Sequence, residues 1–167
     1  MKNIVLIRHA KSSWDLPLPD TQRPLSNRGI KDAHLVAEQV HKILPKSTIV
    51  WSSTAKRAQN TAQIFAEHLH IPLESIIFKD TLYTFDERNL TQTIVKCNNA
   101  YDNLIIFGHN NAITDFVNKF GSLKIDNVPT SGVVFLQFSI KNWQELNKGI
   151  TLHALFPKDI KNELATI

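Results

Sequence analysis

The sequence predicts a single α/β domain of three layers, α/β/α, built around a mostly parallel sheet. Three observations lead to this prediction. The chain has 167 residues, which is the length of one ordinary domain. Short apolar runs typical of buried strands alternate with helical apolar spacings over the first 120 residues. No repeat, low-complexity stretch or linker-like segment divides the chain, so we expect residues 1–167 to form one domain.

The first predicted strand and helix lie on either side of a long irregular segment. Residues 3–7 are a short apolar run, which predicts a buried strand, and residues 9–25 are irregular and contain three prolines. Ser26 is a typical N-cap residue, and the apolar spacing behind it predicts a helix that Pro45 ends. The apolar face of this helix is expected to consist of Ile30, Ala33, Ala37, Val40 and Leu44.

A second strand–helix pair is expected directly afterwards. Residues 48–51 predict the strand, and small side chains at helical spacing predict a helix that packs closely on the sheet. The side chains of this helix face are Ala55, Ala58, Ala62, Phe65 and Leu69. Residues 75–78 predict a short third strand, and residues 87–97 predict a further helix.

The last third of the chain changes its pattern. Residues 103–107 predict another buried strand, followed by a helix that ends at Phe120, with Gly121 as a plausible C′ residue. Residues 132–139 and 150–156 predict two final strands. No helix lies between these two strands, so we expect them to pair antiparallel.

Composition narrows the classes of function. The apolar runs 4–7 and 133–136 are far too short to cross a membrane or to form a secretory signal, so no membrane partner is expected. Cys97 is the single cysteine and cannot form an internal disulfide, which suits the cytoplasm. The net charge of +4 suits an anionic ligand. Aromatic–basic strand signatures are absent, so no nucleic acid partner is expected.

Motifs for metals and nucleotides are also missing. The five glycines are too far apart for a dinucleotide-binding or P-loop motif. The sequence has neither HExxH nor CxxC, and no GxSxG elbow. We therefore expect no metal ion and no organic cofactor.

Arginine and histidine side chains follow three of the predicted strands. Arg8 and His9 end the first strand, Arg57 follows the second after two serines, and His109 follows the strand at 103–107. Ligands of parallel sheets bind at the carboxyl ends of the strands, where these residues should meet. The chain contains only five arginines, and guanidinium groups match tetrahedral oxyanions such as phosphate. The pattern predicts an anion pocket at this edge.

A histidine in such a pocket has a specific chemical use. A neutral imidazole is a nucleophile, and neighbouring positive charges keep it unprotonated. The physical interpretation is a covalent phosphoryl-transfer site. Taken singly, each residue also has a structural explanation: His9 as a hydrogen-bonded strand end, His109 as a helix cap, and the arginines in ion pairs with Asp15, Asp20 or Asp80.

The string Leu-Ile-Arg-His-Ala-Lys-Ser-Ser-Trp at 6–14 resembles the opening of the histidine phosphatase superfamily, in its SixA-like phosphohistidine phosphatase branch. Further motifs of that branch follow in the same order over residues 1 to about 140. They are Arg23-Pro24-Leu25-Ser26 with Arg28-Gly29, Ser52 to Ala58 with Thr61-Ala62, Leu82-Tyr83, Gly108-His109-Asn110 and Pro129-Thr130. The resemblance implies a phosphoglycerate mutase-like fold that lacks a large helical lid.

The same resemblance implies roles for individual residues. His9 would be the catalytic nucleophile, which becomes phosphorylated and is then hydrolysed. Arg8, Arg57 and His109 would complete the catalytic set by binding the phosphoryl oxygens and stabilising the transition state.

Other residues of the motifs are implied at the margin of the site. Arg23 and Asn110 would be substrate contacts, although an ion pair with Asp20 is an alternative explanation for Arg23. Lys11 and Ser12 would line the rim of the pocket.

The proton donor separates the possible substrates. Larger relatives protonate an alkoxide leaving group with a carboxylic acid from an inserted segment, whereas the corresponding region 83–88 is short here. Asp86 or Glu87 could serve, but carboxylates also favour helix N-termini for structural reasons. An imidazole leaving group needs less help. A phosphorylated protein, such as a histidine-containing phosphotransfer domain of a phosphorelay, is therefore the expected substrate.

Three other functions remain open at this point. The first is a small-molecule phosphomonoesterase with the same mechanism and Glu87 as its acid. The second is a phosphate-recognition module that binds phosphorylated partners without turnover. The third, with the least support, is binding of nucleic acid through the basic surface.

Overall fold

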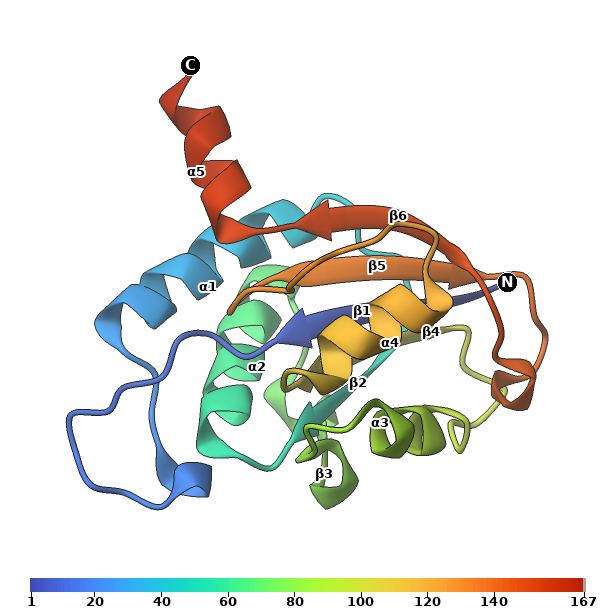
Figure 1. Ribbon diagram of the computed structural model, residues 1–167, viewed down its shortest axis with the longest axis horizontal. Helices are drawn as coiled ribbons and strands as arrows, with labels where there is room; N and C mark the ends of the chain where they lie inside the picture. Colours follow the sequence, from blue (N-terminus) through green and yellow to red (C-terminus); the bar gives the residue numbers. More distant parts are fainter. Residues whose placement is uncertain (167) are drawn as a thin grey trace.

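The computed structural model describes residues 1–166, and strands and helices alternate along it as the sequence predicts (Figure 1). The strands are β1 (Lys2–Arg8), β2 (Thr48–Ser53), β3 (Ile77–Lys79), β4 (Asn103–Gly108), β5 (Val133–Phe138) and β6 (Ile150–Leu155). The helices are α1 (Asn27–Val40), α2 (Lys56–Leu69), α3 (Glu87–Ile94), α4 (Ala112–Phe120) and α5 (Pro157–Ala165). Single 3₁₀ turns form η1 (Asp20–Gln22), η2 (Leu73–Ser75), η3 (Asp80–Leu82) and η4 (Trp143–Glu145).

The strands form one mixed sheet in the order β3-β2-β4-β1-β5-β6. The pairs β1–β4, β2–β4 and β2–β3 are parallel, whereas β5 lies antiparallel to both β1 and β6. The expectation of a mostly parallel sheet that ends in an antiparallel pair is therefore confirmed. Since β1 lies between β4 and β5, the residues that follow it sit at the middle of the sheet edge.

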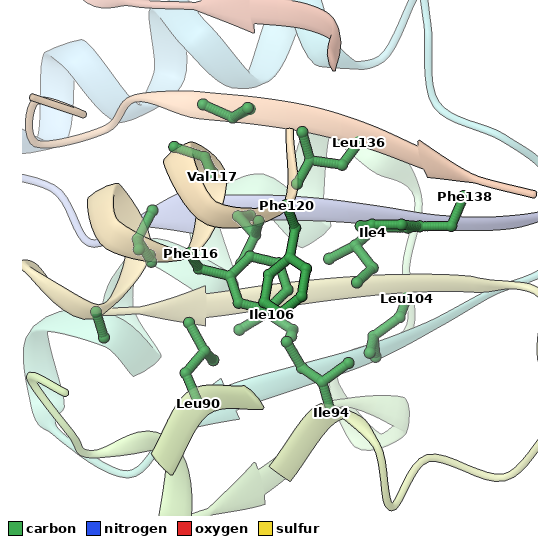
Figure 2. Close-up of a cluster of buried hydrophobic side chains, with 14 of the residues drawn as sticks. Ile4, Leu90, Ile94, Leu104, Ile106, Phe116, Val117, Phe120, Leu136 and Phe138 are labelled. Atoms are coloured by element: carbon green, nitrogen blue, oxygen red, sulfur yellow. The ribbon is translucent and has the colours of Figure 1, made fainter. Parts of the chain in front are cut away.

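Helices cover both faces of the sheet, which confirms the three predicted layers. Along β1, Ile4 and Leu6 point into the core beneath α3 and α4, and Val5 and Ile7 point into the core beneath α1 and α2. Figure 2 shows the first of these cores, where side chains of α4 meet those of the central strands. Burial on both faces explains why β1 reads as a continuous apolar run rather than an alternating one.

Helix α1 begins as predicted but differs along its length. Ser26 is its N-cap, and the Ser26 hydroxyl accepts a 3.0 Å hydrogen bond from the amide of Gly29. The helix ends at Val40, and the chain turns before it reaches Pro45. Ile30 is 39% exposed rather than buried, because the first turn of α1 extends past the sheet and leaves Ile30 at a groove between α1 and α2.

Several other boundaries correct the sequence predictions. The third strand starts at Ile77, because a 3₁₀ turn occupies 73–75, and α3 ends at Ile94 instead of continuing to 97. Gly121 is the C-cap residue and has a φ of −86°, so a left-handed backbone conformation does not explain the glycine. A Cβ at Gly121 would lie 2.5 Å from the hydroxyl oxygen of Thr151, so close packing explains the glycine.

The final helix, α5, was not predicted. Its sequence is mostly polar, with Pro157, Ile160 and Leu164 as a short apolar stripe, and only Pro157 and Ile160 are buried. Within residues 1–166, no helix is both long and apolar enough to cross a membrane.

The segment between β1 and α1 forms a closed loop, residues 11–26, that carries η1. Ser12 and Leu25 form a β-bridge, and the amide of Ser26 donates a 2.9 Å hydrogen bond to the carbonyl of Lys11. Gly29 lets α1 pass directly over this closure, since a Cβ there would collide with the Lys11 carbonyl oxygen. The loop is therefore held next to the carboxyl end of β1.

Candidate active site

The carboxyl ends of β1, β4 and β2 bring the predicted residues to one place. Arg8 pairs in register with Gly108, so His9 and His109 follow side by side, and their ring centroids are 5.2 Å apart. Arg57 reaches the same edge from the first turn of α2. Strand order and register thus gather one nitrogen-rich cluster from residues that are up to 100 positions apart in the chain.

The hydrogen bonds of His9 determine which of its ring nitrogens is free. Nδ1 lies 2.7 Å from the carbonyl oxygen of Ala10. A carbonyl can only accept, so Nδ1 carries the proton and Nε2 keeps its lone pair. Nε2 faces the Nε of Arg57 at 3.4 Å. The amide of Ala10 donates in turn to the hydroxyl of Thr61 at 2.9 Å, which fixes the backbone that orients the ring.

Burial keeps both histidines neutral. Loss of solvent is the main cause that lowers the pKa of His9 to about 4, and nearby Arg57 and Arg8 lower it further against the opposing effect of the Ala10 carbonyl. The pKa of His109 falls to about 3, mainly through burial and then through His9 and Arg57. At neutral pH the cluster therefore contains two uncharged imidazoles, of which His9 can act as a nucleophile.

These pKa values predict how stability depends on pH. In the unfolded chain a histidine titrates near pH 6.5, so below that pH the unfolded state binds protons that the folded state takes up only near pH 4. Folding stability should therefore fall as the pH is lowered from 7 to 5. Urea unfolding midpoints measured across this range would show the decrease. A double variant, His9→Gln with His109→Gln, should show a flatter profile, and an equally steep one would contradict the assignment.

Two further arginines complete a positively charged pocket. Arg8 donates from Nη1 to the carbonyl of Val128 at 3.0 Å, and Arg23 donates from Nη2 to the hydroxyl of Ser12 at 2.5 Å. The guanidinium of Arg23 also stacks on the ring of Trp14, 3.4 Å from its centroid. Among residues 1–166, the Nε of Arg8 and both Nε and Nη1 of Arg23 are buried without a hydrogen-bond partner. Such orphan donors suit an oxyanion.

His109 supplies a further donor. Its Nε2 lies 2.8 Å from the hydroxyl of Ser53, and that hydroxyl already accepts from the amide of Ala55. In the tautomer whose Nε2 accepts the serine proton, the ring proton is on Nδ1. This Nδ1 is buried and has no partner within the described chain. The rings of Tyr83 and Phe85 pack edge-on against His109 and cover it.

Asp20 and Tyr83 are parts of the site that sequence reasoning did not assign to it. Asp20 binds Arg57 twice, with its carbonyl oxygen on Nη1 at 2.7 Å and its carboxylate on Nη2 at 3.0 Å. The hydroxyl of Tyr83 donates to the same carboxylate at 2.6 Å, and the Nε of Arg23 lies 3.6 Å away from it. Of the ion pairs considered from the sequence, those with Asp20 form for Arg57 and Arg23.

A sequence signal for these two residues existed but was ambiguous. Asp20 lies three residues before Arg23, and Tyr83 belongs to one of the family motifs. Neither position follows a predicted strand, so the rule that located the other residues did not apply to them.

The formal charge of the pocket is equal and opposite to the charge of a phosphoryl dianion. Three guanidiniums and the single carboxylate of Asp20 leave a formal charge of +2, since both imidazoles are neutral. A phosphoryl dianion carries a charge of −2. The arrangement can therefore hold a phosphoryl group against the lone pair of a histidine nitrogen.

Asn110 lies next to the cluster, but its side chain is committed elsewhere. Its amide oxygen accepts from the amide and hydroxyl of Thr114, and its amide nitrogen donates to Asn127 and to the carbonyl of Val128. The side chain joins the start of α4 to the segment that receives Arg8. These bonds indicate a structural role, and the implied substrate contact stays a prediction.

The two carboxylates considered as proton donors are also engaged. Asp86 is the N-cap of α3 and accepts from the amide of Arg88 at 2.8 Å. Glu87 forms an ion pair with Lys119 at 3.1 Å and accepts from the hydroxyl of Thr91. Neither is bonded to the histidines or arginines of the site. Within residues 1–166, no group of three or more His, Cys, Asp or Glu side chains is arranged to hold a metal ion.

Comparison with known proteins supports one family for this chain. The family model "Histidine phosphatase superfamily (branch 1)" matches residues 4–82. The Mycobacterium tuberculosis protein named "Uncharacterized protein Rv1276c" is 26% identical over 153 residues, which cover 86% of this chain and 93% of that protein.

Solved structures agree in fold at low sequence identity. SixA from Nakamurella multipartitia superposes with a TM-score of 0.80 at 18% identity, over 93% of this chain and 96% of its own. The protein histidine phosphatase SixA in complex with tungstate gives 0.77 at 17% identity, over 95% and 99%. The mycobacterial glucosyl-3-phosphoglycerate phosphatase Rv2419c gives 0.67 at 14% identity, over 90% and 97%.

These matches confirm the expected phosphoglycerate mutase-like fold in its SixA-like form. Between β3 and β4 the chain contains only η3, α3 and short connections, so no large helical lid is present in the described residues. The family match and the phosphatase neighbours support a phosphatase. The family model over residues 4–82 and the shared fold together support the histidine phosphatase superfamily as the family of this chain.

Proposed function

We propose that this protein is a phosphohistidine phosphatase that acts on a phosphorylated protein through a phosphohistidine intermediate at His9. A histidine-containing phosphotransfer domain of a cytoplasmic phosphorelay or phosphotransfer system is the expected kind of substrate. The support comes from the unprotonated Nε2 of His9, the surrounding donors, and the engagement of Asp20, Asp86 and Glu87 in other bonds within residues 1–166. In both chemical steps, the side chains of Arg8, Arg57 and His109 bind the phosphoryl oxygens. Arg23 contacts the substrate at the margin of the pocket.

The first step is transfer of the phosphoryl group. The lone pair on Nε2 of His9 attacks phosphorus, and the bond from phosphorus to the substrate imidazole breaks. A substrate imidazole that is protonated on its other nitrogen leaves as a neutral ring. His9 becomes a cationic phosphoimidazole that retains its proton on Nδ1, where the carbonyl of Ala10 stabilises the positive charge.

The second step is hydrolysis. Water attacks the phosphorus, the bond to Nε2 breaks, and His9 returns to its neutral form with Nδ1 still protonated. Both water hydrogens remain on the product, which leaves as dihydrogen phosphate. Neither step requires the protein to donate a proton. The developing charge on the phosphoryl oxygens is stabilised by the guanidiniums of Arg8 and Arg57.

The observation that carries this proposal is the state of the nearby carboxylates. Asp20 is the one carboxylate hydrogen-bonded to the described arginines of the pocket. The hydrogen bond from Tyr83, followed by the effects of Arg57, holds the pKa of Asp20 below its usual range, so it is ionised and cannot act as an acid. An alkoxide leaving group needs such an acid, whereas a protonated phosphoimidazole does not.

The rim of the pocket favours a protein over a sugar. Trp14 is 78% exposed beside Arg23, and Phe85 is 53% exposed beside His109. Leu16 and Leu18 are exposed on the same loop as Trp14. An exposed apolar rim of this kind can pack against the protein surface around a phosphorylated side chain.

Substrate comparison tests the proposal. We expect rapid release of phosphate from a phosphohistidine protein and at least about 100-fold lower kcat/KM for sugar phosphates. Glu87→Gln should leave the phosphohistidine activity unchanged, because Glu87 is paired with Lys119. A matched reaction with a chelator should show no loss, since we propose no metal requirement.

One alternative has an observation in its favour. The fold similarity to glucosyl-3-phosphoglycerate phosphatase suits a small phosphomonoester substrate, with Glu87 as the acid. Strong sugar-phosphate turnover that Glu87→Gln abolishes would establish that alternative and reject the phosphohistidine substrate. A recognition module without turnover would bind phosphate but would not form a phosphoenzyme.

A further inference from the structure

We propose that Asp20 is a positioning residue that turns Arg57 toward the phosphoryl-accepting nitrogen of His9, and that Tyr83 holds Asp20 in place. This inference rests on the proposed function, because it concerns how the same pocket is oriented for phosphoryl transfer. It adds two residues that lie in or after 3₁₀ turns to the proposed site.

The geometry of Arg57 carries the first part of the argument. Arg57 is 3% exposed, and its two terminal nitrogens are both bound by Asp20, at 2.7 and 3.0 Å. A guanidinium is planar and rigid, so fixing Nη1 and Nη2 also fixes the direction of Nε. That direction is toward Nε2 of His9, at 3.4 Å. When a phosphoryl group arrives at Nε2, this N–H is already aimed at its oxygens.

Asp20 is held in a way that suits a permanent partner rather than an anion that the substrate displaces. One of its two contacts to Arg57 comes from the backbone carbonyl, which cannot leave without moving η1. The loop that carries η1 is closed by the bridge between Ser12 and Leu25. With Asp20 in place the pocket has a formal charge of +2, which matches the phosphoryl dianion.

Tyr83 connects Asp20 to the opposite side of the pocket. It follows η3, its hydroxyl donates to the Asp20 carboxylate at 2.6 Å, and its ring packs against His109 with centroids 5.3 Å apart. The hydrogen bond lowers the pKa of Asp20 and raises the pKa of Tyr83, so donor and acceptor keep these states at neutral pH. Tyr83 thus holds the carboxylate that binds Arg57.

Kinetics of four variants test the proposal: Asp20→Ala, Asp20→Asn, Tyr83→Phe and the double variant Asp20→Ala with Tyr83→Phe. Asp15→Ala is the matched control, because Asp15 is an exposed carboxylate on the same loop. The substrate is a phosphohistidine protein, and the measurements are kcat, KM, the single-turnover rate of His9 phosphorylation and binding of tungstate.

We expect Asp20→Ala to lower kcat and the phosphorylation rate on the order of 10- to 100-fold, with a KM within about threefold of wild type. Asp20→Asn keeps an oxygen for Nη2 and should recover part of the loss. Tyr83→Phe should cost about three- to tenfold alone and nothing further in the Asp20→Ala background. Asp15→Ala should match wild type.

The opposite results are equally clear. If Asp20 were a plug that competes with phosphate, Asp20→Ala would bind tungstate more tightly and keep or raise its kcat, and the proposal would be wrong. Additive effects of the two substitutions would show that Tyr83 acts independently of Asp20, which contradicts the second part of the proposal. A wild-type protein that never forms a phosphoenzyme would reject the proposed function itself, which is a separate outcome from active Asp20 variants.

Discussion

Alanine at position 9 is expected to abolish turnover of phosphohistidine, with a loss on the order of 10⁴-fold or more. The reason is that Nε2 of His9 is unprotonated and lies beside the guanidinium of Arg57, whose Nε donates a 3.4 Å hydrogen bond to it. The variant should also fail to retain labelled phosphate. The measurement is incubation with a ³²P-phosphohistidine protein, followed by detection of acid-labile label on the chain.

A matched histidine variant makes the result specific. His41→Ala removes an exposed imidazole from the end of α1 and should leave labelling and turnover at wild-type levels. Circular dichroism and an unfolding midpoint would verify that His9→Ala is folded. Labelling that persists in folded His9→Ala would place the nucleophile elsewhere and reject the proposed mechanism.

Removal of the Arg57 side chain is expected to have the second-largest effect. Arg57→Ala deletes the donor that faces Nε2 of His9 and leaves Asp20 without its partner. Loss of one such charged donor typically costs on the order of 10²- to 10³-fold in kcat. Arg57→Lys should recover little of the lost activity, because an ammonium restores the positive charge but not the planar guanidinium that Asp20 binds through two hydrogen bonds. Steady-state and single-turnover rates measure both effects.

Arg88→Ala is the corresponding control, since Arg88 is an exposed arginine on α3. It should behave as wild type, so a similar loss in this variant would show that net charge alone explains the effect. Full activity of Arg57→Lys would show that orientation of the guanidinium is unimportant, in conflict with the role argued for Asp20.

The parts of the fold that sequence predicts well are those with strong burial patterns. Strands β1 and β4 are covered on both faces and therefore appear as apolar runs, and α2 buries small residues at helical spacing. Because parallel strands end at one edge, the same patterns also place His9 and His109 together. The predicted strands, combined with the rule that parallel strands end at one edge, were therefore enough to predict the position of the site.

The remaining parts lack such a pattern. Asp20 and Tyr83 lie in a loop and after a 3₁₀ turn, where neither a period of two nor one of 3.6 residues applies. The apolar stripe of helix α5 is too short to predict a helix from the sequence. The hydrogen bonds of Asn110 to Thr114 and Val128 depend on how α4 packs against a segment distant in sequence, and the sequence pattern does not reveal this packing.

The position of β1 between β4 and β5 has a consequence for how the enzyme comes into existence. Arg8 is bound by the carbonyl of Val128, 120 residues away, and the amide of Ser131 bonds to the carbonyls of Arg8 and His9. The proposed nucleophile, His9, lies near the start of the chain, yet part of its surroundings comes from the carboxyl-terminal third. Contacts of such long range form late and together, so catalytic competence emerges only once nearly the whole polypeptide has been assembled.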